Sequence, residues 1–178
     1  MRTASAFDAC VTGADYADPW DQLIADFKFH QKTELAAALC DLVWRAVREA
    51  AHGARPALLL PVPLSRERLR ERGYNQAWEL ARRLARRLDV AARADVLQRS
   101  RDTPHQIGMT RAEREHNLRD AFWIEPRQRD RLQGVHVALV DDVFTTGATA
   151  HAAALALTRA GAARVDVWVA TRTPLGDE

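Results

Sequence analysis

The sequence predicts an α/β domain in which a mostly parallel central sheet is flanked by helices. Segments typical of strands and of helices alternate from residue 56 to residue 172, as parallel strands joined by crossover helices require. Two of the strand segments, "PALLLPVP" and "GVHVALV", are apolar almost throughout, which is expected of strands buried on both faces. The chain has 178 residues and 47% hydrophobic content, which suits one domain over residues 1–178.

Residues 1–52 are expected to form an N-terminal strand followed by two helices. The segment "FDACVTGADY" alternates weakly, as an edge strand does. Pro19 opens a helical segment, 19–30, whose apolar residues are spaced for one buried face: Trp20, Leu23, Ile24 and Phe27. A second helix covers roughly residues 32–51 and ends near Gly53.

Residues 56–178 are expected to form the core of the domain. In chain order we expect a buried strand (56–63), an amphipathic helix (73–88), two short strands (95–99 and 121–125), the strongest strand (134–142), a helix (148–161) and a closing strand (163–172). Gly161 stands where a helix C-terminus favours glycine. The segment between the two short strands is polar and has almost no core residues.

The stretch "VALVDDVFTTGATA", residues 137–150, carries the strongest functional signal. In parallel sheets, ligands bind at the carboxyl ends of the strands, and "HVALV" ends at Asp141, so both Asp141 and Asp142 should emerge at that edge. The following loop leads into a helix N-terminus, where backbone N–H groups and the helix dipole favour an anion. Gly147 allows close approach of the backbone, and hydroxyl donors surround it: Thr145, Thr146 and Thr149.

A ligand with vicinal hydroxyls and a phosphate group would satisfy both halves of this stretch, and ribose 5-phosphate has that shape. The carboxylates would accept hydrogen bonds from the hydroxyls while the loop holds the phosphate. The alternative is structural: Thr145 or Thr146 caps the helix, and the two aspartates are solvated turn residues.

"VALVDDVFTTGAT" closely resembles the signature of type I phosphoribosyltransferases, which bind 5-phosphoribosyl 1-pyrophosphate (PRPP). The resemblance implies the type I phosphoribosyltransferase fold with a mobile flap. It also implies that Asp141 and Asp142, the catalytic pair, hold the ribose hydroxyls directly or through Mg²⁺. The 5′-phosphate would be bound by the loop residues Thr145, Thr146, Gly147, Ala148 and Thr149.

Three further segments narrow the resemblance to the ComF/GntX family: "DYADPWDQLIADFKFHQK", "LLLPVPLSRERLRERGYNQAWELA" and "RSRDTPHQIGMTRAEREHNLRDAF". Together with the signature they cover nearly the whole chain. Family members usually begin with a small cysteine-rich module, and we find no trace of it in this sequence. Its absence leaves the predicted fold unaffected.

The resemblance also assigns residues to the pyrophosphate group of PRPP. The loop "PVPLSRER" would bind it through Leu64, Ser65 and Arg66, and the polar segment 99–119 would close over it as a flap, with these residues reaching inward: Arg101, Gln106, Arg111 and Arg114. Each of these arginines could instead be solvated. Lys28 could contact a phosphate or be a solvated helix lysine, and the sequence gives no role for "RGYNQ", residues 72–76.

The expected reaction is transfer of phosphoribose to an unidentified acceptor with release of pyrophosphate, a pentosyl transfer supported by Mg²⁺. Purine salvage members of the superfamily place an acidic residue where this chain has Thr145, which disfavours a purine acceptor. One alternative is a non-catalytic PRPP- or nucleotide-binding accessory protein in DNA uptake (competence) or sugar-acid utilisation, acting with a competence-related partner. The other alternative, direct binding of single-stranded DNA, is disfavoured by the net charge of only +2.

The amino-acid composition limits which other classes of protein the chain could belong to. Of 26 basic residues only Lys28 and Lys32 are lysines, an arginine bias that fits a genome rich in G and C. Cys10 and Cys40 are far apart, which indicates neither a disulfide framework nor a zinc site. The sequence shows neither an apolar stretch long enough to span a membrane nor a secretion signal, so we expect a cytoplasmic protein, for which a homodimer is one assembly to test.

Overall fold

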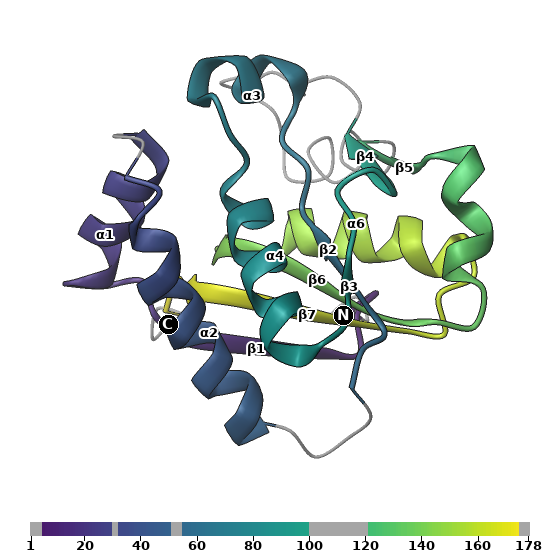
Figure 1. The fold of residues 1–178 in the computed structure, drawn as a ribbon, viewed down its shortest axis with the longest axis horizontal. Coiled ribbons are helices and arrows are strands. Elements are labelled where there is room, and N and C mark those ends of the chain that lie inside the picture. Colours follow the sequence, from purple (N-terminus) through teal and green to yellow (C-terminus); the bar gives the residue numbers. More distant parts are fainter. Residues whose placement is uncertain (1–4, 30–31, 51–54, 100–120, 175–178) are drawn as a thin grey trace.

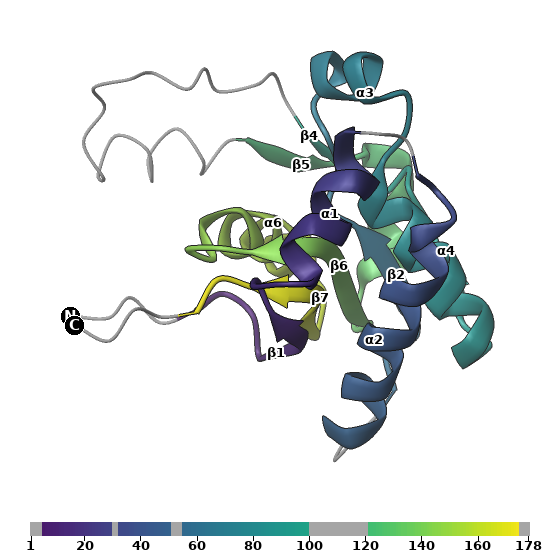
Figure 2. The same cartoon turned by 90° about the vertical axis from the view of Figure 1, so that its left-hand side faces the viewer.

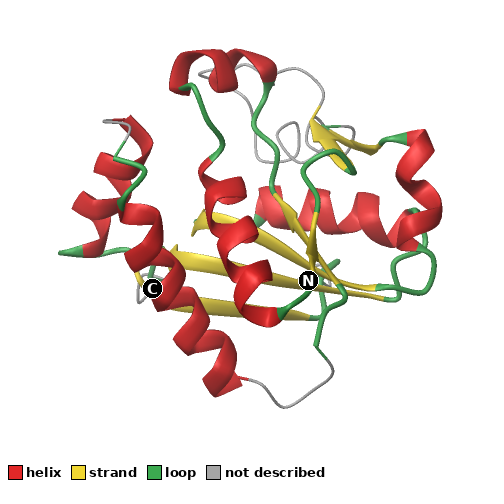
Figure 3. Cartoon of the chain, viewed as in Figure 1, coloured by secondary structure: helices red, strands yellow, loops and turns green. Residues whose placement is uncertain are grey.

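Five parallel strands form the central sheet of the computed structural model, in the order β1-β7-β6-β2-β3 (Figures 1 and 3). The structure describes residues 5–29, 32–50, 55–99 and 121–174. The strands are β1 (Ala9–Asp15), β2 (Leu58–Pro61), β3 (Ala91–Ala92), β6 (His136–Phe144) and β7 (Arg164–Arg172), and each of the four neighbouring pairs is parallel. The predicted α/β class with a mostly parallel sheet is therefore confirmed, and so is the edge position of β1.

Helices cover both faces of this sheet (Figure 2). They are α1 (Trp20–Phe29), α2 (Leu35–Ala50), α3 (Arg66–Arg72), α4 (Gln76–Leu88) and α6 (Ala148–Arg159), with a 3-10 helix η1 (Pro126–Leu132). Helices α1, α2 and α4 share one apolar core with the sheet, and α6 packs on the opposite face. Two short strands, β4 (Leu97–Arg99) and β5 (Phe122–Ile124), form an antiparallel pair on the α6 side.

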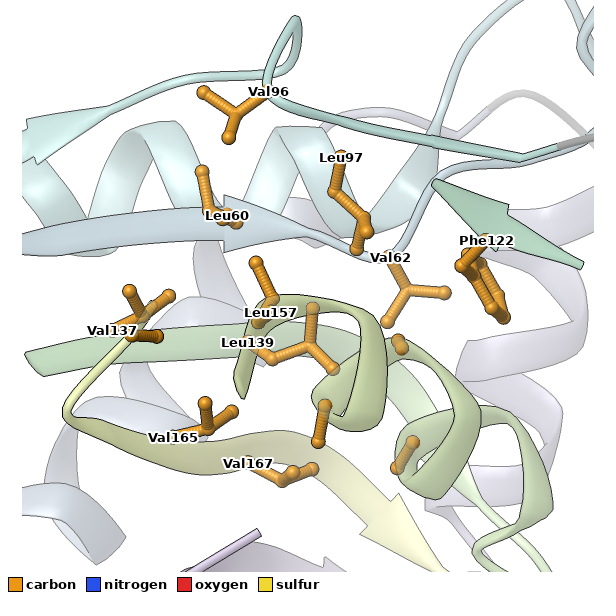
Figure 4. Packing of buried hydrophobic residues seen from close by; sticks show 14 of the residues in the cluster. Leu60, Val62, Val96, Leu97, Phe122, Val137, Leu139, Leu157, Val165 and Val167 are labelled. Atoms are coloured by element: carbon orange, nitrogen blue, oxygen red, sulfur yellow. The ribbon is translucent and has the colours of Figure 1, made fainter. Parts of the chain in front are cut away.

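The two cores explain why β6 is apolar throughout. Ala138 and Val140 belong to the core beneath α2 and α4, whereas Val137 and Leu139 belong to the core beneath α6 (Figure 4). Successive side chains of a strand point to opposite faces, so a strand covered on both sides needs apolar residues at every position.

The predicted helix 73–88 begins later than expected and is preceded by a short helix that the sequence analysis missed. Gly73 ends α3 with a left-handed backbone (φ 80°), and its N–H donates to the carbonyl of Leu69. Asn75 then caps α4, because its side-chain oxygen accepts from the backbone N–H groups of Ala77 and Trp78. Gly73 therefore ends α3 and Asn75 starts α4, so the expected helix begins at Gln76 instead of Gly73.

The sheet changes its direction of winding between β2 and β6. From β2 the chain passes through α4 to β3 on one side, and from β6 it passes through α6 to β7 on the other. Because α4 and α6 lie on opposite faces of the sheet, the loops after β2 and β6 run in opposite directions. In open α/β sheets, ligands bind in the crevice between two such loops. These strand ends are adjacent: the N–H of Val62 donates to the carbonyl of Val140 (2.8 Å).

Within the described ranges, none of the helices combines the length and the apolar character needed to cross a membrane. Cys10 is exposed, Cys40 is buried, and both are free thiols.

Candidate functional site

The strand β6 extends further than the sequence suggested, and this changes the placement of the two carboxylates. Instead of ending at Asp142, the strand runs to Phe144, because β7 continues alongside it and Phe144 pairs with Arg172. Asp141 and Asp142 are therefore strand residues. Asp142 reaches Lys28 of α1, and the Asp141 carboxyl lies close enough to Asp142 and Lys28 for both to affect its pKa.

Asp142 forms an ion pair with Lys28 from the last turn of α1. The Nζ atom of Lys28 lies 3.1 Å from Oδ2 of Asp142, and the two side chains are 20% and 9% exposed. The reading of Lys28 as a solvated helix lysine was therefore wrong. The last turn of α1 is anchored by Phe27, which is fully buried, and this anchor brings the neighbouring lysine over the end of β6.

Asp141 lies in an environment that disfavours its charge. Burial first, and then the adjacent Asp142, raise the pKa of the Asp141 carboxyl to about 8, against the opposing effects of the backbone N–H of Asp142 and of Lys28. That N–H donates to Oδ1 of Asp141 (2.9 Å). A carboxyl that is costly to ionise in the ligand-free protein is typical of a site where a ligand or a cation replaces the proton.

The loop after β6 exposes backbone donors at the start of α6. Gly147 occupies the N-cap position with a left-handed backbone (φ 78°), and no side chain caps the helix there. The nearest hydroxyl is that of Thr146, 3.4 Å from the N–H of Ala148, which is a weak contact. Thr145 and Thr146 are exposed. The arrangement gives little support to a purely structural capping role and leaves donors available for an anion.

Gly147 is required here for a second reason besides its backbone angle. A Cβ atom at this position would lie 2.6 Å from Cζ of Phe144, whose ring packs beneath the loop. The ring of Phe7 meets Phe144 edge to face, with centroids 6.1 Å apart. The close contact between Gly147 and the Phe144 ring therefore limits how the loop can lie against the end of the sheet.

The loop after β2 reaches the same edge of the sheet as Asp141 and Asp142. Ser65 is buried and caps α3, since its hydroxyl accepts from the N–H of Arg68 (3.2 Å). Leu64 is half-buried, and Arg66, the first residue of α3, is exposed. The structure thus places the loop predicted for pyrophosphate next to the carboxylates, with the Ser65 hydroxyl engaged in the helix cap.

The segment "RGYNQ", which had no assigned role, joins three parts of the site. The hydroxyl of Tyr74 donates to the carbonyl of Phe27 at the end of α1. The Nδ2 atom of Asn75 donates to the carbonyl of Val62 in the loop after β2 (3.1 Å). These contacts are between residues distant in the chain, so no local pattern in the sequence could have revealed them.

Gln76 completes this segment. Its side chain is buried (2% exposed) and accepts from Nη1 of Arg72 (3.2 Å), while its Nε2 atom has no partner among the residues that the structure describes. A buried donor without a partner is uncommon in folded proteins. The start of α4 therefore offers one more unused donor.

The residues assigned to the flap lie outside the described residues. This applies to Arg101, Gln106, Arg111 and Arg114. The strands β4 and β5 flank this segment and pair with each other, as the short strands expected at these positions should.

The carboxylate oxygens at the end of β6 suit a hard metal cation that binds together with a ligand. In the described part of the chain, no group of three or more His, Cys, Asp or Glu residues could hold a metal ion alone. Magnesium usually binds through one or two carboxylates together with substrate phosphates and water. Asp141 and Asp142 match that donor set in type and number.

Three arginines of α4 form ion pairs within the protein. Glu79 pairs with both Arg82 and Arg83, and Arg87 pairs with Asp41.

Comparison with known proteins identifies the family. Residues 75–176 match the phosphoribosyl transferase domain family. The DNA utilization protein YhgH of Escherichia coli K12 is 38% identical over 169 residues, which cover 92% of this chain and 71% of that protein. The chain belongs to the ComF family of type I phosphoribosyltransferase-like proteins.

Competence protein F of Haemophilus influenzae is another relative of this ComF-family protein, 33% identical over 171 residues, or 94% of this chain and 74% of that one. Among solved structures, the glutamine PRPP amidotransferase of B. subtilis, in complex with ADP and GMP, superposes with a TM-score of 0.54 at 19% sequence identity. The match covers 82% of the ComF-family chain and 30% of the longer enzyme. This likeness confirms the type I phosphoribosyltransferase fold.

Proposed function

We propose that this protein binds PRPP together with Mg²⁺ and transfers the phosphoribosyl group to an unidentified acceptor, releasing pyrophosphate. The observation that carries the proposal is the junction of β6 and α6, where two carboxylates stand next to a helix N-terminus without a side-chain cap. The junction lies at the position where the sheet changes its direction of winding. Sugar hydroxyls suit the first group and a phosphate suits the second.

In this proposal the protein acts by positioning and by charge. Asp141 and Asp142 accept hydrogen bonds from the ribose hydroxyls, while residues 145–149 hold the 5′-phosphate through backbone donors and hydroxyls. Leu64, Ser65 and Arg66 hold the pyrophosphate that leaves. The metal, when bound, neutralises charge on that leaving group. Fixed donors of this kind stabilise a transition state without a covalent enzyme intermediate.

The flap assignment is part of the same proposal. Closure of residues 99–119, with Arg101, Gln106, Arg111 and Arg114 toward the pyrophosphate, would exclude water from a sugar with cationic character at C1. Water would otherwise compete with the acceptor.

A second candidate function is a non-catalytic, PRPP- or nucleotide-binding role in DNA uptake, exercised through a protein partner. The names of two relatives favour it, since one is a competence protein and the other a DNA utilization protein. In this case the site would bind its ligand without turnover.

Calorimetric titration with PRPP and Mg²⁺ tests the site, and pyrophosphate detection with a panel of acceptors tests turnover. We expect micromolar-range binding by the wild-type protein and loss of that binding in the Asp141→Asn, Asp142→Asn double variant. Asp130→Asn, in the exposed η1 helix, is the matched control. Binding without pyrophosphate release would favour the accessory role, and absence of PRPP binding would contradict both candidates.

A further inference from the structure

The last turn of α1 is fastened to the site by Phe27. The side chain of Phe27 is fully buried, its carbonyl accepts from the hydroxyl of Tyr74, and its ring lies 5.8 Å from the Tyr74 ring between centroids. One residue of the turn before α4 thus fixes both the backbone and the ring of the residue that precedes Lys28.

The residue that follows Lys28 contacts Arg72, the last residue of α3. Phe29 is 67% exposed, yet the guanidinium carbon of Arg72 lies 5.4 Å from the centre of its ring, within cation–π distance. Contacts on both sides of Lys28 therefore limit where its side chain can go. The lysine extends to Asp142, the carboxylate at the end of β6.

Lys28 and Lys32, the only lysines of the chain, differ sharply in their surroundings. Lys32 pairs with Asp26 at 2.6 Å, and both of these side chains are well exposed (46% and 36%). Lys28 follows the fully buried Phe27 in the chain and pairs with the largely buried carboxylate of Asp142. An exposed pair of the first kind contributes little to stability, whereas a partly buried pair at a ligand site is screened less by solvent.

We propose that Lys28 is a ligand-binding residue of this site, whose ammonium orients Asp142 toward a sugar hydroxyl and donates to the pyrophosphate group of a polyanionic sugar phosphate. The proposal rests on the proposed function and gives Lys28 a specific role there, where the sequence left two readings open. An ammonium has three donors, and one contact with Asp142 leaves others for ligand oxygens.

The sheet face on which Lys28 lies indicates which ligand group it meets. The 5′-phosphate loop leads into α6 on the opposite face, whereas α4, which lies beyond the loop after β2 in the chain, packs on the side of Lys28. Asn75 ties the start of α4 to that loop through Val62. Lys28 is therefore placed for the pyrophosphate end of the ligand.

The two lysines allow a direct test on the wild-type protein. Acetylation by a lysine-directed reagent is followed at each lysine by mass spectrometry, with and without Mg²⁺-PRPP. We expect Lys32 to react at an unchanged rate and Lys28 to become at least about tenfold slower. Equal reactivity of Lys28 in both samples, at saturating PRPP, would overturn the inference.

Variants give an independent measurement. Loss of a charge-assisted hydrogen bond should lower PRPP affinity about tenfold or more in Lys28→Met, and ribose 5-phosphate affinity about threefold or less. Lys28→Arg should recover part of the PRPP affinity, and Lys32→Met should bind as the wild type does. If Lys28→Met binds PRPP as tightly as the wild type, while the Asp141→Asn, Asp142→Asn variant does not bind it, the inference fails and the proposed function stands.

The reactivity of Lys28 also tests whether Tyr74 positions the last turn of α1. Tyr74→Phe removes the donor to the Phe27 carbonyl, and we expect Lys28 to react at least twofold faster relative to Lys32 in the ligand-free protein. A fall in melting temperature with an unchanged reactivity ratio would assign Tyr74 to stability alone. Should the wild type bind no PRPP, the proposed function fails, and the same footprint with Mg²⁺-pyrophosphate decides whether Lys28 binds an anion.

Discussion

Replacing Gly147 by alanine tests the geometry of the phosphate loop. A left-handed backbone at a non-glycine residue costs about 1–2 kcal/mol. The added Cβ would also lie 2.6 Å from Cζ of Phe144, and overpacking of this kind costs about 1–3 kcal/mol. We therefore expect Gly147→Ala to lower the free energy of unfolding by about 3 kcal/mol, which for a chain of this size is a fall in melting temperature of about 6–12 °C.

A second glycine separates the two costs. Gly134 also has a left-handed backbone (φ +69°), but a Cβ there would meet no atom within 4 Å. Gly134→Ala should therefore show the backbone cost alone, about half of the total effect, and should bind PRPP as the wild type does. The two variants differ only in contact with Phe144 and in proximity to the site.

Thermal unfolding followed by circular dichroism and calorimetry with PRPP measure both effects. Gly147→Ala should also lose PRPP affinity, because the backbone donors around residue 147 would shift. Equal melting temperatures for the two variants would refute the contact argument, and full PRPP affinity in Gly147→Ala would refute the role of the loop.

Two further predictions concern the carboxylate Asp141 and the cap of α4. Burial and Asp142 raise the pKa of Asp141 in the folded protein above its unfolded value near 3.8, so the ligand-free protein should lose stability as the pH rises from about 4 to about 8. Asp141→Asn should remove this loss in melts recorded across that range, and parallel profiles would contradict the assignment. For Asn75, we expect Asn75→Asp to keep the cap while losing the donor to Val62, and Asn75→Ala to lose both, about 1–3 kcal/mol in total. The reasoning fails if both variants melt at the same temperature.

The order of the elements could be read from the sequence because each depends on residues close together in the chain. The apolar runs of β2 and β6 and the spacing of Leu80, Leu84 and Leu88 in α4 are local patterns. Such patterns predict which segments bury a face, and Leu80, Leu84 and Leu88 are buried as predicted. The boundaries were less secure, since the helix expected over 73–88 begins only at Gln76, and the short helix α3 before it was not expected.

The candidate site could be predicted only where its residues are neighbours in sequence. Asp141, Asp142 and the loop around Gly147 form one continuous stretch, and the structure keeps them together at the end of β6. The expected end of β6 was wrong because strand length depends on the partner strand: β7 continues to Arg172 and extends the pairing.

The alternation of strands and helices can be read from the sequence because it depends on short-range periodicity. The carboxylates, hydroxyls and glycine of the β6–α6 junction can be read from it because they are adjacent in the chain. Tertiary structure alone decided that Lys28 faces Asp142 and that Tyr74 fastens α1 beside the loop after β2. These contacts join residues far apart in the chain. They exist because burial of Phe27 and Ile24 docks α1 against the core, and no local pattern specifies where a docked helix places its polar side chains.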